Sequence, residues 1–347
     1  MTSQAEGETV PARDARTGTD RTRATARRNG VEKEPPAPVL TGDRLVVGTV
    51  PPLVPGTGVL LVLAGLVGIA AAFAPYLTVD GQQLRQVDGV GSALVALLVP
   101  GVQLAVGATL IRRAVPKFGL AYAAVAAALA VGQLLIEIYR GRSSTSRPGV
   151  EVLAGEVVLT SGIEVGAGWV LGLGALALTV VAGLVGTVAW GRTVMEDRGP
   201  LDAVRSLLAG AAVLLGVATA VCLTVPTADV PDQLRTDPAT GFESVVTQEG
   251  PQALLERPGL ALLGGLLLTG ALLLCSVVAP SLRPRLAVVG GLLAVAVAVL
   301  AAGLVGLQDA ASSEELEWTV PGMGLLALGL AFLALTAVAW RARRSAV

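Results

Sequence analysis

The sequence contains no histidine, and among its 347 residues it has only two cysteines, four tryptophans, four phenylalanines and three tyrosines. Without histidine, Ser-His-Asp triads, imidazole proton shuttles and zinc sites with His ligands are excluded. The two cysteines, Cys222 and Cys275, are too few for a four-thiolate metal site or a disulfide framework. We expect both to be small apolar packing residues, at depths too different for a disulfide.

Charge is scarce as well. Charged residues make up 15% of the chain and hydrophobic residues 53%, whereas soluble domains carry about a quarter charged residues. The net charge of −1 does not indicate a nucleic-acid-binding protein. Basic residues are almost all Arg, and Asn29 is the single asparagine; this bias favours a high-GC genome such as that of an actinobacterium.

Long uncharged windows take the place of the missing charge. A helix that spans a bilayer needs about 20 apolar residues, and eight windows meet this length, so the sequence predicts an all-α polytopic integral membrane protein. The unbroken windows lack the alternation typical of barrel strands. The predicted helices cover residues 55–77, 93–111, 119–138, 167–190, 204–226, 259–280, 286–307 and 322–340.

Three regions follow from this pattern. Residues 1–53 are rich in Arg, acids and Pro and predict a disordered leader. The leader is not a signal peptide, because the first apolar run begins only near Val54. Residues 54–340 predict the transmembrane domain, with longer loops near 139–166 and 227–258, and residues 341–347 a short basic tail.

The distribution of basic residues predicts the orientation. With the N-terminus in the cytoplasm, the cytoplasmic segments hold 19 of the 25 basic residues, and the opposite side holds 16 of the 26 acidic residues. The positive-inside rule therefore predicts that both termini lie in the cytoplasm. From the composition bias, we expect the membrane to be a bacterial plasma membrane. The near-zero net charge is a cancellation between a basic and an acidic face.

The two longer loops carry β-prone segments and many acids. Residues 150–153 and 156–159 predict a hairpin around Ala154-Gly155. In the second loop, a turn at 237–241 precedes a β-prone stretch at 242–247, and 252–257 predicts a helical turn. The acids either balance the basic face or offer a surface to a partner or cation.

Repeated patterns indicate how the helices pack. Helices two, four, six and eight each begin after glycines and run to an arginine, which predicts a helical hairpin used four times. Small residues four apart predict a packing stripe on helix seven, within the chain or in a homo-oligomer. The stripe comprises Gly290, Ala294, Ala298, Ala302 and Gly306. Tryptophans at the helix ends predict interface anchors at Trp169, Trp190, Trp318 and Trp340.

Few polar residues remain inside the predicted spans. Gln103 lies near Pro100 in helix two, and Gln133 and Glu137 share one face of helix three. Two readings stay open for these residues. One is structural, with a hydrogen bond between helices two and three and a headgroup-level ion pair of Glu137 with Arg140 and Arg142. The other is an intramembrane polar cluster, Gln103, Gln133 and Glu137, lining a cavity for a small molecule or lipid headgroup.

No phosphate-binding, dinucleotide-binding or nucleophile motif stands in the required context, so we predict no catalytic, cofactor-binding or metal site. Three functions stay open. The first is a non-enzymatic accessory or scaffold that presents its acidic outer loops to an envelope partner. The second is a transport component for a small molecule or lipid, and the third a membrane-embedded transferase on lipid-linked substrates. The partners expected are the bilayer and a membrane or envelope protein, and not nucleic acid.

Overall fold

The structure is a computed structural model, and it describes most of residues 45–341. The gaps are 49, 80–81, 88, 147–148, 154–155, 162, 198–201, 230–232, 237–242, 247–252, 255, 257 and 313–315. The predicted leader falls outside the described residues up to position 44, and so does the tail from position 342. The chain divides into a unit from Met1 to Gly42 and a unit from Asp43 to Val347, and only the second is described below.

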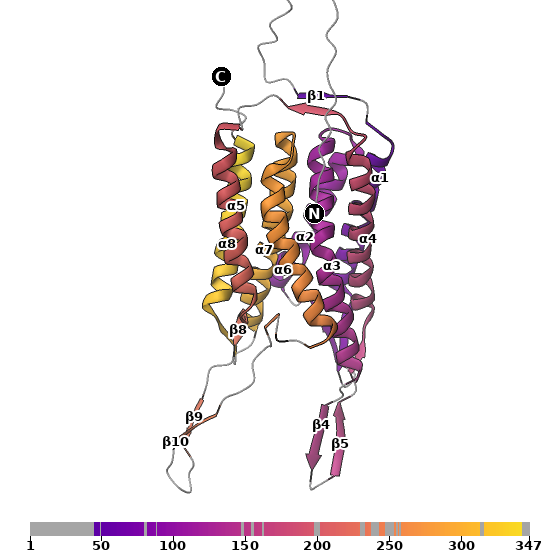
Figure 1. The fold of residues 1–347 in the computed structure, drawn as a ribbon. Coiled ribbons are helices and arrows are strands. Elements are labelled where there is room, and N and C mark those ends of the chain that lie inside the picture. Colours follow the sequence, from indigo (N-terminus) through magenta and orange to yellow (C-terminus); the bar gives the residue numbers. More distant parts are fainter. Residues whose placement is uncertain are drawn as a thin grey trace, which may run out of the picture. The chain divides into compact units, whose positions relative to one another are not determined.

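Eight helices in the described part of the chain are long and apolar enough to cross a membrane, as predicted. They run side by side in Figure 1. Their bounds are α1 Leu53–Phe73, α2 Val90–Ile111, α3 Pro116–Ser146, α4 Ala167–Trp190, α5 Asp202–Leu223, α6 Leu260–Val278, α7 Arg285–Ser312 and α8 Val320–Arg341.

Helices α3 and α7 form the centre of the bundle. In each, 61% of the most apolar window is buried, against 22–33% in the other six helices. Large apolar side chains on the outer helices stay exposed, for example Leu184, Leu207 and Leu214, as expected where lipid covers the surface. A short 3-10 turn, η1 (Ala279–Ser281), joins α6 to the start of α7.

The helices pack closely at small residues, because apolar burial alone gains little in lipid. A side chain on Gly58 of α1 would collide with the carbonyl oxygen of Gly107 in α2, and the reverse also holds. The same mutual contact joins Gly132 of α3 to Gly264 of α6. These crossings fix the distances between backbones.

Short strands connect the helix ends. After α1, β2 (Pro75–Val79) pairs antiparallel with β3 (Gln82–Arg85) and with β6 (Ile163–Val165), which precedes α4. After α5, β8 (Ala228–Asp229) pairs with β11 (Glu317–Trp318), which precedes α8. We call this end of the bundle, where α1, α3, α5 and α7 finish, the hairpin end, and the other the terminal end.

The longer loops carry the strands predicted for them. β4 (Gly149–Leu153) pairs antiparallel with β5 (Glu156–Ser161), which confirms the predicted hairpin. β10 (Glu243–Val246) lies inside the β-prone stretch predicted at 242–247, and it pairs with β9 (Gln233–Thr236), which was not predicted. Most of the loop acids lie outside the described side chains.

The two halves of the bundle make corresponding contacts. In the first half, α1 packs against α2 and α4, and α3 against α4; in the second, α5 packs against α6 and α8, and α7 against α8. The strand pair β2–β6 corresponds to β8–β11. The strands that precede α1 and α5, β1 (Leu45–Val47) and β7 (Met195–Asp197), pair with each other. The halves are not separate bodies, because α3 also packs against α6 and α7. The strand β1 lies within the predicted leader.

Candidate functional site

A cleft of about 540 Å³ lies among the helices toward the hairpin end. Its walls come from both halves: Gly68 and Pro100 belong to α1 and α2, and Leu268 and Ala302 to α6 and α7. Volumes of this size are typical of ligand sites. The lining reaches the exposed side chain of Gln86 at the hairpin end.

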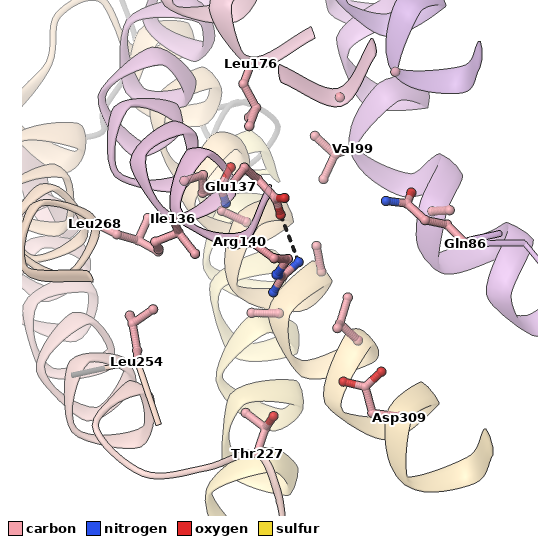
Figure 2. A pocket seen from close by; sticks show the side chains of 18 of the residues that line it. Gln86, Val99, Ile136, Glu137, Arg140, Leu176, Thr227, Leu254, Leu268 and Asp309 are labelled. Atoms are coloured by element: carbon pink, nitrogen blue, oxygen red, sulfur yellow. Dashed lines mark hydrogen bonds and ion pairs between the residues drawn. The ribbon is translucent and has the colours of Figure 1, made fainter. Parts of the chain in front are cut away.

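The mouth of the cleft holds a charged cluster, which we call the mouth cluster: Tyr76, Glu137, Arg140 and Asp309. All four line the cleft. The Glu137 carboxylate accepts a hydrogen bond of 2.6 Å from the Tyr76 hydroxyl at Oε2, and its Oε1 lies 3.0 Å from Nη1 of Arg140. Figure 2 shows this ion pair, with Asp309 facing the same space from α7.

Arg140 also interacts electrostatically with Asp309. These two residues hold equivalent positions in the halves, because each lies 24 residues after the first residue of its helix, Pro116 in α3 and Arg285 in α7. Because α3 belongs to the first half and α7 to the second, the pair stands at the boundary between the halves. Among the described lining residues the charged ones are Glu137, Arg140 and Asp309.

Contacts between β2 and the start of α4 position Tyr76 and Trp169 beside Glu137. Tyr76 lies in β2, and its carbonyl oxygen accepts a hydrogen bond from the Gly166 N–H just before α4. A side chain at Gly168 would collide with carbonyl oxygens at the end of α1, so glycine permits this close approach of α4. Three residues into α4, Trp169 donates from Nε1 to the carbonyl oxygen of Glu137 at 2.9 Å.

Burial, with the nearby Glu137 carboxylate, raises the pKa of Tyr76 to about 12. The phenol therefore stays protonated at neutral pH and donates to Glu137 throughout the physiological range.

Polarity falls steeply with depth. Gln133 lies about one helical turn deeper than Glu137 and lines the cleft. From Asp309 to Ala298, α7 descends eleven residues, or about 16 Å at 1.5 Å per residue, and its lining residues between them are small and apolar. The deepest lining residues are Gly, Ala, Val, Leu and Pro, including Gly68, Pro100, Leu176 and Ala298.

The predicted polar cluster is divided in the structure. Gln133 and Glu137 line the cleft, but Gln103 does not belong to the lining. Gln103 is buried and donates from Nε2 to the Thr179 hydroxyl of α4 at 3.0 Å, so its partner is helix four and not Gln133 in helix three. Glu137 does pair with Arg140, as the structural reading expected.

The packing stripe on α7 serves two purposes. A side chain on Gly290 would collide with the backbone of Phe118 in α3, and one on Gly306 with Thr227. Ala294 is buried, whereas Ala298 and Ala302 line the cleft. The stripe thus faces neighbouring segments at its ends and the cleft between them.

The four tryptophans have different environments. Trp169 lines the cleft, and Trp190 packs under the Lys117 ammonium, 5.2 Å from the ring centroid. Trp318 is half-buried in β11, and Trp340 is exposed near the end of α8. Trp169 therefore belongs to the cleft lining and links α4 to α3 through its hydrogen bond to the Glu137 carbonyl oxygen.

Sequence reasoning missed Tyr76 and Asp309. Tyr76 was expected within helix one, and helix seven was expected to end at residue 307, which left Asp309 in a loop. Arg140 and Asp309 each lie 24 residues after the first residue of their helix. This equal spacing was the one sequence signal that could have predicted that the two residues lie at the same depth.

Both thiols are free, as expected, with Cys275 buried and Cys222 half-buried. Among the described residues, no group of three or more acids and cysteines is placed to hold a metal ion. No family model, curated protein or solved structure matches this chain.

Proposed function

We propose that this protein binds an amphiphilic molecule in the cleft, with the polar end at the mouth cluster and the apolar part along α4 and α7. It would act as a lipid or small-molecule transport component. The observation that carries the proposal is the gradient within the cleft, from Tyr76, Glu137, Arg140 and Asp309 at the hairpin end to alanine and leucine at its depth. A purely apolar ligand would not need the charged mouth, and a purely polar one would not suit the floor.

The position of the cleft supports transport more than catalysis. Many transporters bind their substrate at the boundary between two repeated halves, and the walls of this cleft come from both halves. The scaffold function remains a proposal for the acidic loops, most of whose side chains lie outside the described residues.

We also propose that the hairpin end faces away from the cytoplasm, that both termini are cytoplasmic, and that the membrane is a bacterial plasma membrane. The support for the orientation is the excess of Arg and Lys in the segments at the terminal end, and the support for the bacterial membrane is the bias of the composition toward Arg and away from Asn. Reporter domains fused after Val347 and inserted within residues 227–257 are expected to report opposite sides. Reports from the same side would contradict the orientation.

Occupancy of the cleft can be measured through Trp169. In protein that carries Trp190→Phe, Trp318→Phe and Trp340→Phe in phosphatidylcholine nanodiscs, dodecanol brominated next to its hydroxyl is expected to quench Trp169 saturably. The substitution Gly172→Phe should abolish the saturable part, because Gly172 lines the cleft and has open space around its Cα. Abolition requires the affinity for dodecanol to fall by at least about tenfold, which corresponds to at least about 1.4 kcal/mol.

The matched control is Gly101→Phe. Gly101 is an exposed helical glycine with equally open space, and it does not line the cleft. We expect it to leave quenching unchanged. Equal quenching in both variants, or purely linear quenching in all proteins, would mean that dodecanol reaches Trp169 from the bilayer and that the cleft is not a binding site.

A further inference from the structure

Along the described helices, the cleft ends inside the bundle. On α1, α2, α3, α4, α6 and α7, the residue about one turn below the deepest lining residue does not line the cleft and is at most 6% exposed. These six residues are Ala64, Gln103, Leu129, Thr179, Leu272 and Val295. The cleft therefore has a closed floor at the level of Gly68, Leu176 and Ala298.

Close contacts hold this floor in place. Gln103 of α2 donates to Thr179 of α4 just beneath it, and the Thr179 hydroxyl donates to the Ala175 carbonyl oxygen at 2.8 Å. A Cβ atom at Gly68 of α1 would lie 3.0 Å from Cγ of Pro100. Because packed interiors yield little, a ligand cannot extend past this level without displacing buried side chains.

The depth of the cleft sets a length. From Asp309 at the mouth to Ala298 at the floor, α7 descends about 16 Å at 1.5 Å per residue. Carbon–carbon bonds of about 1.5 Å at tetrahedral angles add about 1.25 Å per carbon to an extended chain. About 12 or 13 carbons therefore reach from the mouth cluster to the floor.

The volume of the cleft sets the number of tails. A heavy atom with its hydrogens occupies about 30 Å³, as a water molecule does in the liquid, so the 540 Å³ of the cleft hold about 18 heavy atoms. One tail of about 12 carbons with a small head group fills this space. The two tails of a membrane phospholipid exceed it.

We propose that the ligand is a single-tailed amphiphile whose tail is limited by the floor to about 12 carbons; this inference rests on the proposed function. The head group stays at the mouth cluster, and the tail ends beside Leu176 and Ala298. A longer chain would press against Thr179 and Val295 or lift its head group out of the mouth cluster.

A series of alcohols tests the length limit. Octanol, dodecanol and hexadecanol, each brominated next to the hydroxyl, are titrated against Trp169 in the same nanodiscs, with concentrations expressed as mole fractions in the bilayer. Octanol and dodecanol are expected to bind with similar affinities, because transfer of methylenes from lipid to an apolar cleft gains little. Hexadecanol should bind about tenfold more weakly.

Two results of this series have different meanings. Saturable binding of hexadecanol as tight as that of dodecanol would overturn the length limit and leave the amphiphile site intact. Absence of saturable binding for all three alcohols would overturn the proposed function itself.

Competition tests the number of tails. Unlabelled dioctanoylglycerol has two tails that are each short enough for the cleft, but together they exceed its volume. It is expected not to displace brominated dodecanol, whereas unlabelled dodecanol does. Displacement by dioctanoylglycerol would overturn the assignment to a single tail.

Ala298→Leu raises the floor and tests its position. The octanol tail spans about 10 Å and stops near Ala302, so the variant should keep octanol binding and weaken dodecanol binding about tenfold. The matched control is Ala177→Leu, at an exposed residue of α4 beside Leu176 and outside the cleft lining, which should change neither affinity. Equal losses for octanol and dodecanol in Ala298→Leu, or the same loss of dodecanol binding in Ala177→Leu, would contradict a floor at this level.

Discussion

Replacement of Gly132 by leucine is expected to lower the stability of the protein more than any other single change considered for this bundle. A Cβ atom at Gly132 would lie 2.6 Å from both the carbonyl oxygen of Gly264 and the backbone nitrogen of Leu268. Both are main-chain atoms of α6, so no rotamer change can relieve the collision. The helices α3 and α6 must separate, at a cost of about 3 kcal/mol, the upper part of the usual range for overpacking.

The measurement is the free energy of unfolding in mixed detergent micelles, with Gly270→Leu as the matched control. Gly270 also lies in α6, but nothing stands within 4 Å of a Cβ built there. The control should unfold within about 0.5 kcal/mol of the wild type, as surface changes usually do. Equal losses in the two variants would show that the α3–α6 crossing does not depend on Gly132.

Replacement of Arg140 by methionine is expected to have the second largest effect. It leaves the carboxylates of Glu137 and Asp309 without the cation that lies near both. Breaking a fully buried ion pair costs about 3–5 kcal/mol, and an exposed pair is worth about 0–1. The side chains of Arg140 and Glu137 are 46% and 25% exposed, so we expect a loss of about 2 kcal/mol in the same unfolding assay.

A second substitution identifies the cause of this loss. Arg140→Met combined with Glu137→Gln should be more stable than Arg140→Met alone, because the extra carboxylate charge has been removed. The comparison variant Arg142→Met changes an exposed arginine of the same helix, and it should have little effect. If Glu137→Gln fails to restore stability, the contribution of Arg140 is packing of its stem and not charge.

The helices were predictable because each apolar window is about as long as a bilayer span requires, or longer, but the ends of the helices were not. Helix α1 stops at Phe73, earlier than predicted, because Pro75 opens β2 and lacks an N–H for the helix. Helices α3 and α7 continue past their apolar windows to Ser146 and Ser312, since hydrophobicity marks the membrane and not the end of backbone hydrogen bonding.

The hydrophobic pattern also decides which residues of the site could be predicted. Gln133 and Glu137 stood out as polar residues on one face of an apolar helix, and both line the cleft. Gln103 met the same criterion, but its position on α2 turns it toward Thr179 of α4. The sequence has no signal for which neighbour a helix face meets. Asp309 enters the site only because α7 extends beyond its apolar window.

The most direct test of the central claim, that the cleft holds an amphiphile, is an experimental structure of the full chain in nanodiscs that contain dodecanol. We expect elongated density in the cleft, with its polar end at the mouth cluster and its tail beside Ala298 and Gly172. A cleft that is closed by its own side chains, or that holds only water down to Ala298, would contradict the account.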